Sequence, residues 1–545
     1  MTLHPVPLSA KYPGAAVPGS LQRACSADKQ QIGAYFSQKG FPFSSALVRE
    51  MDGSLCHIAY EPALPGFQAA AEDDAVSSLY FNIDPLPFLA GRTEPVGDSL
   101  DIATAILAQS PRRLEVTLAL GALPSEQLFR EAVRRHFGTP PHAIHSHHAP
   151  ANGEHAPWMQ DFLKPGRRGR QEHILVTRRA FEGVADHAAR LDSVLDSFRA
   201  PVFERSNLSW EGGDLQFARH PKDDNKLVMF YGTSMKQYWG ESLTREELEY
   251  VLRREFGADE AVYLDDVTPH ADYLLSLLPE RQTALVAKPV CGDLRVARAA
   301  LDVLLHHHAG AAPTELQRLD SLLPAHGTMP HPPAELREAL ENAAAARKHW
   351  KAPRNTGVES RVLSFVQANC PGDPAACVAA ERLPQLLDQQ PALLRDWVDA
   401  GGSIRLANLL NQRMLELMES QTSGCADLAA KADLAAAHVA RLGFRVIRIP
   451  WLPASAENRQ EWAGISYANA ARIDETLFVP AFGLEPVEKE WFAQLRSELP
   501  SGYKLVPVPA RFLLLENGGL HCAIAFGRQP AAHEPDHAGP TGAFD

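Results

Sequence analysis

The sequence predicts an α/β fold built from repeated units in which short strands accompany a single helix. Two observations lead to this prediction. Short apolar runs typical of strands alternate with longer segments of helical apolar spacing, first in residues 96–313 and again in residues 424–529. The strand-like runs also come in pairs around single helices, which favours ββαβ-like units over a doubly wound sheet.

The expected elements follow one another in a regular order. Residues 1–95 are weakly patterned and are predicted to be an N-terminal extension, with one short strand at residues 78–83. Helices are expected at residues 98–108, 124–137, 180–198, 244–256, 294–307, 427–442 and 486–498. Strands are expected at residues 113–120, 173–177, 226–231, 274–278, 283–288, 445–449, 468–473 and 476–480. Residues 138–157, dense in histidine, are expected to form a polar loop.

Residues 314–423 interrupt this rhythm. Strand-like runs vanish there, and Ala- and Leu-rich helical sequence dominates, so we predict a helical insertion between the two α/β parts. One segment, Pro391 to Glu419, has an apolar helical face that must be buried against the rest of the protein or against a second subunit, which would make a homo-oligomer. Residues 530–545, rich in Pro, His and Gly, are expected to be a disordered tail.

Composition narrows the class of protein. The 545 residues are 45% hydrophobic, enough for a substantial core, and no apolar stretch approaches the roughly 18 residues needed to span a bilayer. With 66 acidic against 53 basic residues the formal charge is −13, which argues against nucleic acid or an anionic membrane as the main partner. A small cationic ligand suits this charge better.

The cysteines indicate a reducing compartment. Seven of them, an odd number, are scattered along the chain and do not form the pattern of a disulfide framework. Cys370 and Cys377 are the one local pair that could bridge. Residues 1–19 lack a basic segment followed by an apolar run, so no secretory signal is expected and the predicted location is cytoplasmic.

Leu513 to Ala523 presents the strongest candidate for a reactive side chain. An apolar run breaks at Gly518-Gly519 and is followed by His521 and Cys522. A cysteine beside glycines can be approached from a side that a Cβ would block, but its sulfur attacks only as a thiolate and therefore needs partners from elsewhere in the chain. The alternative is that Cys522 is a small buried hydrophobic residue.

Four short motifs in a fixed order carry a resemblance. They are Trp158-Met159-Gln160-Asp161, Glu211-Gly212-Gly213-Asp214, His270-Ala271-Asp272 and Asn517-Gly518-Gly519-Leu520-His521-Cys522. In this order they resemble the agmatine deiminase and Porphyromonas-type peptidylarginine deiminase family of the guanidino-group-modifying superfamily. The segment Tyr467-Ala468-Asn469 also resembles that family. The resemblance covers about residues 96–310 and 424–529.

The resemblance implies a fold and a chemistry. The fold is a five-bladed pseudosymmetric α/β propeller with the site on its axis. The implied reaction is hydrolysis of a guanidinium to a ureido product and ammonia through a thiouronium on Cys522, without cofactor or metal. His270 would act as acid and base, oriented by Glu211, while Asp161 and Asp272 would hold the guanidinium. Trp158 and Asp214 would help to shape the binding site.

Several readings stay open. Asp161 could cap a helix, residues 211–214 could form only a tight turn, and His270 with Asp272 could be a surface pair or two metal ligands. The same scaffold would suit an amidinotransferase or a dihydrolase, and a silent binding protein is the alternative outside enzymes. Three substrates fit: agmatine, arginine and peptidyl arginine. Deimination of agmatine lies on the route to putrescine, and deimination of arginine gives citrulline. Gln160 departs from the arginine common in the family, and an insertion beside the entrance would favour small free substrates over proteins.

Overall fold

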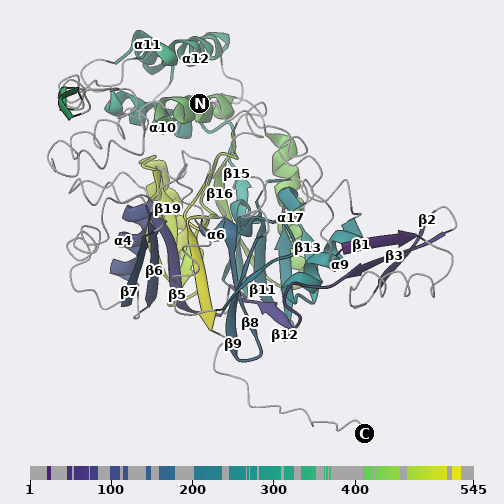
Figure 1. The fold of residues 1–545 in the computed structure, drawn as a ribbon. Helices are drawn as coiled ribbons and strands as arrows, with labels where there is room; N and C mark the ends of the chain where they lie inside the picture. Colours follow the sequence, from purple (N-terminus) through teal and green to yellow (C-terminus); the bar gives the residue numbers. More distant parts are fainter. Residues whose placement is uncertain are drawn as a thin grey trace, which may run out of the picture.

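The structure is a computed structural model, shown in Figure 1, in which strands gather in one half and helices α10, α11 and α12 lie above them. It describes residues 21–25, 46–51, 54–72, 74–83, 99–110, 114–120, 143–148, 159–177, 202–235, 243, 245–264, 267–268, 270–278, 282–308, 312–323, 333–350, 361, 364–365, 367–369, 409–422, 425–454, 463–511 and 518–529. The expected helices at 124–137 and 180–198 and the tail at 530–545 lie outside this part of the chain.

One unit shows the repeating pattern of the described sheets. Strands β11 (Leu215–His220) and β12 (Asp223–Tyr231) pair antiparallel, helix α9 (Arg245–Phe256) follows, and β13 (Glu260–Tyr263) returns parallel to β12. Acidic residues in the first turn of α9 and arginines in its last turn complement the helix dipole. The helix buries one side at spacings of three and four, so the fold is α/β as predicted.

Four more sheets repeat this pairing of an antiparallel pair with a parallel third strand. Their strands are β8 (Leu163–Arg168), β9 (Gln171–Val176) and β10 (Val202–Arg205); β14 (Leu275–Leu278), β15 (Thr283–Pro289) and β16 (Arg445–Leu452); β18 (Ala471–Ile473), β19 (Thr476–Ala481) and β20 (Lys504–Pro509); and β21 (Ile524–Gln529), β5 (Ala75–Ile83) and β6 (Glu115–Leu120). Helices α4 (Ser99–Gln109) and α18 (Val487–Glu498) connect the second and third strands of two of these units. The predicted ββαβ-like repeat is therefore present in the described chain.

Three short strands extend these sheets and three others form a separate one. The added strands are β4 (Phe67–Ala69) beside β8, β7 (Ala143–His148) beside β6, and β17 (Ile465–Ser466) beside β16. The separate sheet, at the right of Figure 1, is built from β1 (Leu21–Cys25), β2 (Ala46–Met51) and β3 (Ser54–Tyr60). Part of the histidine-rich segment predicted as a loop is thus a strand, because β7 pairs in parallel with β6 at the edge of its sheet.

The last described strand, β21, lies in one sheet with β5, a strand from the first hundred residues. β21 pairs antiparallel with β5, and β5 in turn pairs in parallel with β6. β5 lies within residues 1–95, which were expected to be an extension, so this part of that segment belongs to the core sheets. The partner strand is more than four hundred residues away in the sequence, beyond the reach of any local pattern. The other domain boundaries stay predictions.

The segment predicted to be a helical insertion contains only helices among its described residues. They include α11 (Thr314–Leu322), α12 (Ala334–Ala346), the 3-10 turn η5 (Arg347–His349) and a helix over residues 409–422. Leu316, Leu340, Leu410 and Met414 are buried in the same apolar cluster as strands of four α/β units. The described insertion therefore packs on the core, while residues 391–408 lie outside the described part.

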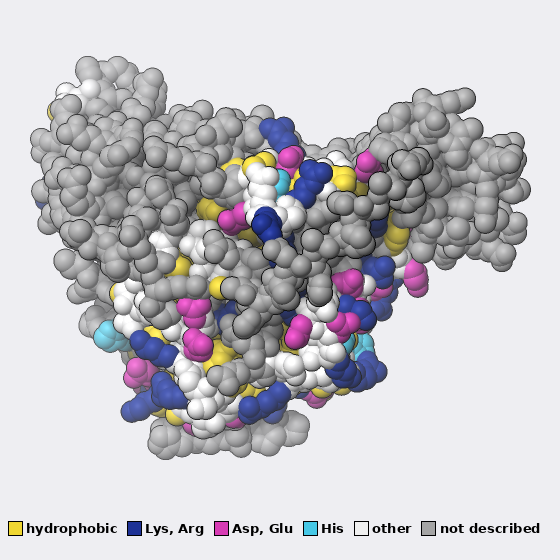
Figure 2. Space-filling model, turned by 90° about the horizontal axis from the view of Figure 1, so that it is seen from below, with side chains coloured by type: hydrophobic (Ala, Val, Ile, Leu, Met, Phe, Trp, Pro, Cys, Tyr) yellow, Lys and Arg dark blue, Asp and Glu magenta, His cyan; other side chains and the backbone are white. Residues whose placement is uncertain are grey.

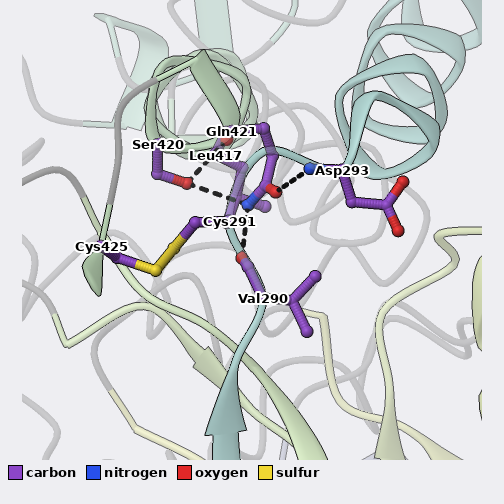
Figure 3. Close-up of a disulfide and its surroundings, with 7 residues drawn as sticks. All are labelled: Val290, Cys291, Asp293, Leu417, Ser420, Gln421 and Cys425. Atoms are coloured by element: carbon purple, nitrogen blue, oxygen red, sulfur yellow. Dashed lines mark hydrogen bonds between the residues drawn. A yellow bond between two sulfur atoms is a disulfide. The ribbon is translucent and has the colours of Figure 1, made fainter. Parts of the chain in front are cut away.

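A disulfide fastens the insertion where it leaves and rejoins the sheets. Cys291, just before α10 (Leu294–His307), is bonded to Cys425, just before α17 (Ala426–Leu442). Beside it, the Gln421 side chain donates to the carbonyl of Val290 and accepts from the amide of Asp293 (Figure 3). The sequence predicted no disulfide framework and only one local pair that could bridge, and it did not indicate this bond, whose partners are 134 residues apart. The predicted pair Cys370 and Cys377 lies outside the described residues.

The distribution of surface charge and the lengths of the helices bear on whether the protein contacts nucleic acid or a membrane. On the face seen in Figure 2, the described acidic and basic side chains are interspersed rather than gathered by sign. Among the described helices, none is both long and apolar enough to cross a membrane.

Candidate active site

The candidate residues all occur in short segments that end just before the first strand of a unit. Asp161 lies in α6 (Met159–Phe162) before β8, and Cys522 lies in a turn before β21. Glu211 and His270 are extended residues that precede the 3-10 turns η2 (Gly212–Asp214) and η3 (Ala271–Tyr273), which lead into β11 and β14. Equivalent positions in repeated units thus supply the chemistry, and hydrogen bonds between the segments show that they meet.

Cys522 lies at the centre of these contacts. Its thiol donates to Oδ2 of Asp272 at 3.2 Å and accepts from Nδ2 of Asn469 at 3.2 Å. Its carbonyl accepts from the amide of Gln160 at 3.1 Å, which ties the turn to α6. The residue is 2% exposed, and its thiol is free rather than part of a disulfide. Burial alone would suit a hydrophobic cysteine, but three polar partners indicate a positioned thiol.

Glycine at 519 lets Asn469 reach this turn. A Cβ at that position would come within 2.3 Å of Oδ1 of Asn469, the atom that accepts from the amide of His521 at 2.7 Å. The glycine is therefore required for the close approach of the side chain that also holds the Cys522 sulfur.

Asp272 offers one occupied and one open oxygen. Oδ2 accepts from the thiol of Cys522 and from Nδ1 of His521, both at 3.2 Å. Oδ1 is buried and has no hydrogen-bond partner among the described residues. A buried carboxylate oxygen without a donor is costly, so this atom marks a place where a ligand with N–H groups would be stabilised.

His270 and Glu211 form the second charged pair of the site. Nε2 of His270 contacts Oε2 of Glu211 in a very short ion pair. Burial opposes the charged ring, but the hydrogen bond to Cys522 and the carboxylates of Asp161 and Asp272 raise the pKa of His270 to about 10. The side chains are 17% and 13% exposed, so water and substrate can reach the pair.

Gly213 borders the space between these groups. Its amide donates to Oδ1 of Asp161 at 3.2 Å. A Cβ there would lie 2.9 Å from Nδ1 of His270, 3.0 Å from Oδ2 of Asp272 and 3.1 Å from Oδ1 of Asp161. The predicted acid–base residue His270 and the two predicted substrate carboxylates therefore lie around one point. Any side chain at residue 213 would fill that point.

Burial and the two carboxylates keep the thiol protonated in the empty site. Desolvation raises the pKa of Cys522, Asp272 and Asp161 raise it further, and His270 opposes them. The same carboxylates that would attract a cation thus hold the nucleophile in its resting form, and a bound cation would reverse that effect.

Asp214 is held by backbone amides rather than by other side chains of the site. Its two carboxylate oxygens accept from the amides of Gly232 and Met235 at 2.8 and 2.6 Å, and the side chain is fully buried. It fixes the segment after β12 behind the site, so it shapes the site without an oxygen open to substrate. Trp158 lies outside the described residues.

Four charged or polar residues near the site were not predicted. Asn469 holds the thiol, although the sequence already showed it in a segment resembling the family. Lys164 donates to the carbonyls of Gly212 and Leu215, and burial lowers its pKa to about 8. Arg528 and Glu72 form a very short ion pair, and the arginine lowers the pKa of Glu72 despite burial.

The donors His270, Asp272 and Cys522 also have the chemistry of metal ligands. Their ligand atoms lie within 4.8 Å of one another. A structural zinc site takes four such ligands, whereas a nucleophile, a base and a carboxylate suffice for thiol chemistry. The arrangement fits the second use without a further group.

Sequence comparison gives one family match. The profile of the Porphyromonas-type peptidyl-arginine deiminase family matches residues 418–525, a range that contains Asn469 and Cys522 but not Asp161, Glu211 or His270. No curated protein matches the chain.

Solved structures give remote likenesses. Agmatine deiminase of C. jejuni is 13% identical and has a TM-score of 0.44, over 85% of this chain and 96% of that chain. Agmatine deiminase of Enterococcus faecalis is 10% identical with a TM-score of 0.41, over 85% and 96%. A dimethylarginine dimethylaminohydrolase is 12% identical with a TM-score of 0.31, over 83% and 99%. Likenesses at this level do not assign an activity.

The match to the family profile and the four motifs point the same way from different residues. The profile rests on the end of the chain, and three of the motifs lie well before it. The predicted resemblance is thus confirmed: residues 418–525 of this chain match the profile of the Porphyromonas-type peptidyl-arginine deiminase family.

Proposed function

We propose that this protein is a C–N hydrolase that deiminates a guanidino compound to a ureido product and ammonia. The observation that carries the proposal is the open Oδ1 of Asp272, a buried carboxylate oxygen beside the thiol of Cys522. A guanidinium is planar and cationic and carries several N–H donors, so it would satisfy this oxygen and bring its central carbon toward the sulfur.

Substrate binding would also prepare the nucleophile. A guanidinium between Asp161 and Asp272 would offset the two charges that raise the pKa of Cys522. The thiol could then pass its proton from Sγ to solvent, and the thiolate would lie opposite an imidazolium on His270, whose raised pKa keeps it charged. The binding of a cation would thereby be coupled to the activation of the sulfur.

The reaction would proceed in two halves. In the first, Sγ of Cys522 bonds to the central carbon, His270 gives its proton to one nitrogen, and the C–N bond breaks to release ammonia and leave a thiouronium. In the second, His270 takes one proton from water as the water oxygen bonds to the same carbon. The C–S bond then breaks, and the remaining hydroxyl proton passes to the sulfur, which gives the ureido product and the thiol. The sum is one guanidinium plus one water to one urea plus one ammonium.

The remaining site residues would support these steps. Glu211 holds the ring of His270 through Nε2 and stabilises its charge, and Asn469 holds the sulfur from the other side. Asp214 shapes the site from behind. No cofactor is required, because the thiol supplies the nucleophile and the carboxylates supply the charge.

The arrangement of the five α/β units around the site is part of the same proposal. Five sheets share one strand pattern, and the pairing of β21 with β5 joins the last described strand to an early part of the chain. We expect the five units to form a five-bladed propeller around the site. The contacts between the segments before β8, β11, β14, β18 and β21 support this expectation.

The proposed partner is a small cationic guanidino compound such as agmatine or free arginine, with no nucleic acid or membrane required. A net charge of −13 supports a cation, and the described insertion helices pack on the core that carries the site. An insertion near the entrance would exclude a folded protein's arginine. A homo-oligomer also stays part of the proposal.

A panel of guanidino compounds tests the reaction. Purified protein is incubated with agmatine, arginine, a peptidyl arginine and smaller guanidines, and ammonia and ureido product are measured. We expect equal amounts of both products, no effect of a chelator, and no activity in Cys522→Ala. Two ammonia per substrate would indicate a dihydrolase, and dependence on an added amine a transferase. Turnover by Cys522→Ala would refute the thiol mechanism.

A further inference from the structure

His521 connects the substrate carboxylate to a buried ion pair that the reaction itself does not use. The imidazole is 5% exposed and lies between two acids: Nδ1 is 3.2 Å from Oδ2 of Asp272, and Nε2 is 3.8 Å from Oε1 of Glu72. The second distance is that of an ion pair rather than a hydrogen bond. Burial lowers the pKa of His521, but the two acids raise it above its usual value. The imidazolium is therefore favoured.

The acid on the far side of this histidine is fixed by arginines. Arg528 contacts the Glu72 carboxylate and donates to its carbonyl at 2.8 Å, and Arg472 contacts the same carbonyl. The ring of His521 stacks on Phe526 at 5.9 Å, and the guanidinium of Arg528 lies 5.0 Å from the same ring. The position of the imidazole is therefore set from several sides before any ligand binds.

This fixed imidazole determines which oxygen of Asp272 remains open. A carboxylate can rotate and present either oxygen, unless a donor holds one of them. Because Nδ1 of His521 and the Cys522 thiol both lie on Oδ2, Oδ1 is left toward the ligand. The thiol gives up its proton during the reaction, and His521 alone would then hold Oδ2.

We propose that His521, backed by Glu72, is a positioning residue that holds Oδ2 of Asp272 so that Oδ1 faces the guanidinium. This inference rests on the proposed function for the identity of the ligand, and it adds a residue that touches neither substrate nor leaving group. Its working atom is Nδ1, since Nε2 points to Glu72.

Two isosteric substitutions separate the atoms of the ring. The amide nitrogen of Asn reaches about as far as Nδ1, and that of Gln about as far as Nε2. His521→Asn should therefore keep the donor to Asp272, and His521→Gln should lose it. His308→Gln is the matched control. His308, the residue after α10, is also 5% exposed, and its Nε2 is hydrogen-bonded to Asn411 of the insertion at 2.9 Å.

The readout is a pair of alkylating probes that does not require turnover. 2-Chloroacetamidine is cationic and 2-chloroacetamide is neutral, and both modify Cys522, with Cys522→Ser as the blank for other thiols. The ratio of the rate with the cationic probe to the rate with the neutral probe measures how strongly the site carboxylates bind a planar cation. We expect His521→Gln to lower this ratio, and kcat/KM for the best guanidine, by about tenfold or more, because small displacements in a site are costly. His521→Asn should stay within about threefold, and His308→Gln should match the unsubstituted protein.

Each outcome decides the inference. A folded His521→Gln protein with the unsubstituted ratio and kcat/KM would overturn it, and so would equal losses in His521→Asn and His521→Gln. If no guanidine is turned over but the ratio falls in His521→Gln and not in His521→Asn, the proposed reaction is wrong and the positioning role stands. Should His521→Gln fail to fold, a loss of the ratio in the folded His521→Asn protein would refute the role of Nδ1.

Discussion

The turns before β11 and β14 begin alike and differ in their chemistry. In each, an extended residue, Glu211 or His270, precedes a 3-10 turn that contains an aspartate. Both oxygens of Asp214 are occupied by backbone amides, whereas Asp272 has one oxygen with no partner in the described chain. The comparison teaches that the role of an acid in a repeated turn is decided by the donors around it, since a satisfied carboxylate stabilises the fold and an unsatisfied one awaits a ligand.

Asp272→Asn should give the largest effect on catalysis. Its side-chain oxygen can still accept from His521 and Cys522, while its NH2 takes the open position, where it meets the donors of the guanidinium. We expect kcat/KM to fall by about 10³-fold or more, with little change in melting temperature. Steady-state kinetics and calorimetry measure the two effects. A large loss of stability would show that Asp272, like Asp214, is structural.

Glu211→Gln should have a smaller effect and change the pH profile. The carboxylate beside His270 favours the imidazolium, so its loss lowers the pKa of that ring from about 10. Activity that requires the imidazolium is present below this pKa and lost as pH rises through it. We therefore expect a basic limb near pH 10 in the unsubstituted enzyme, an earlier limb in the variant, and a kcat/KM about 10²-fold lower. A limb that does not move would contradict the assignment of His270.

Asp214→Asn should reverse the pattern of Asp272→Asn. Because both oxygens of Asp214 already accept, the NH2 of asparagine must face the amide of Gly232 or Met235. We expect a loss of about 1–3 kcal/mol in the free energy of unfolding and less than a tenfold change in kcat/KM. Denaturant unfolding with parallel kinetics checks both, and a stable but inactive variant would place Asp214 on the substrate.

The sequence was sufficient for what depends on local pattern. Helix α10 (Leu294–His307) was predicted to the residue, and the five residues predicted for chemistry meet in one place: Asp161, Glu211, His270, Asp272 and Cys522. Their meeting follows from equivalent positions in repeated units, which short motifs can indicate.

What depends on distant partners could not be predicted. The pairing of β5 with β21, the Cys291–Cys425 bond and the contact of Glu72 with Arg528 each join residues more than a hundred positions apart. The role of Asp214 was hidden because its motif does not reveal which amides fold back onto it. The open oxygen of Asp272 is likewise a property of the assembled site.

Trapping the covalent intermediate tests the central claim most directly. The enzyme is mixed with its best guanidine, quenched in acid within milliseconds to seconds, and analysed by mass spectrometry of the intact protein and its peptides. We predict an adduct with the mass of the substrate less one ammonia, located on Cys522 and absent from Cys522→Ser. Turnover to the ureido product with no such adduct, or an adduct on another residue, would contradict the account.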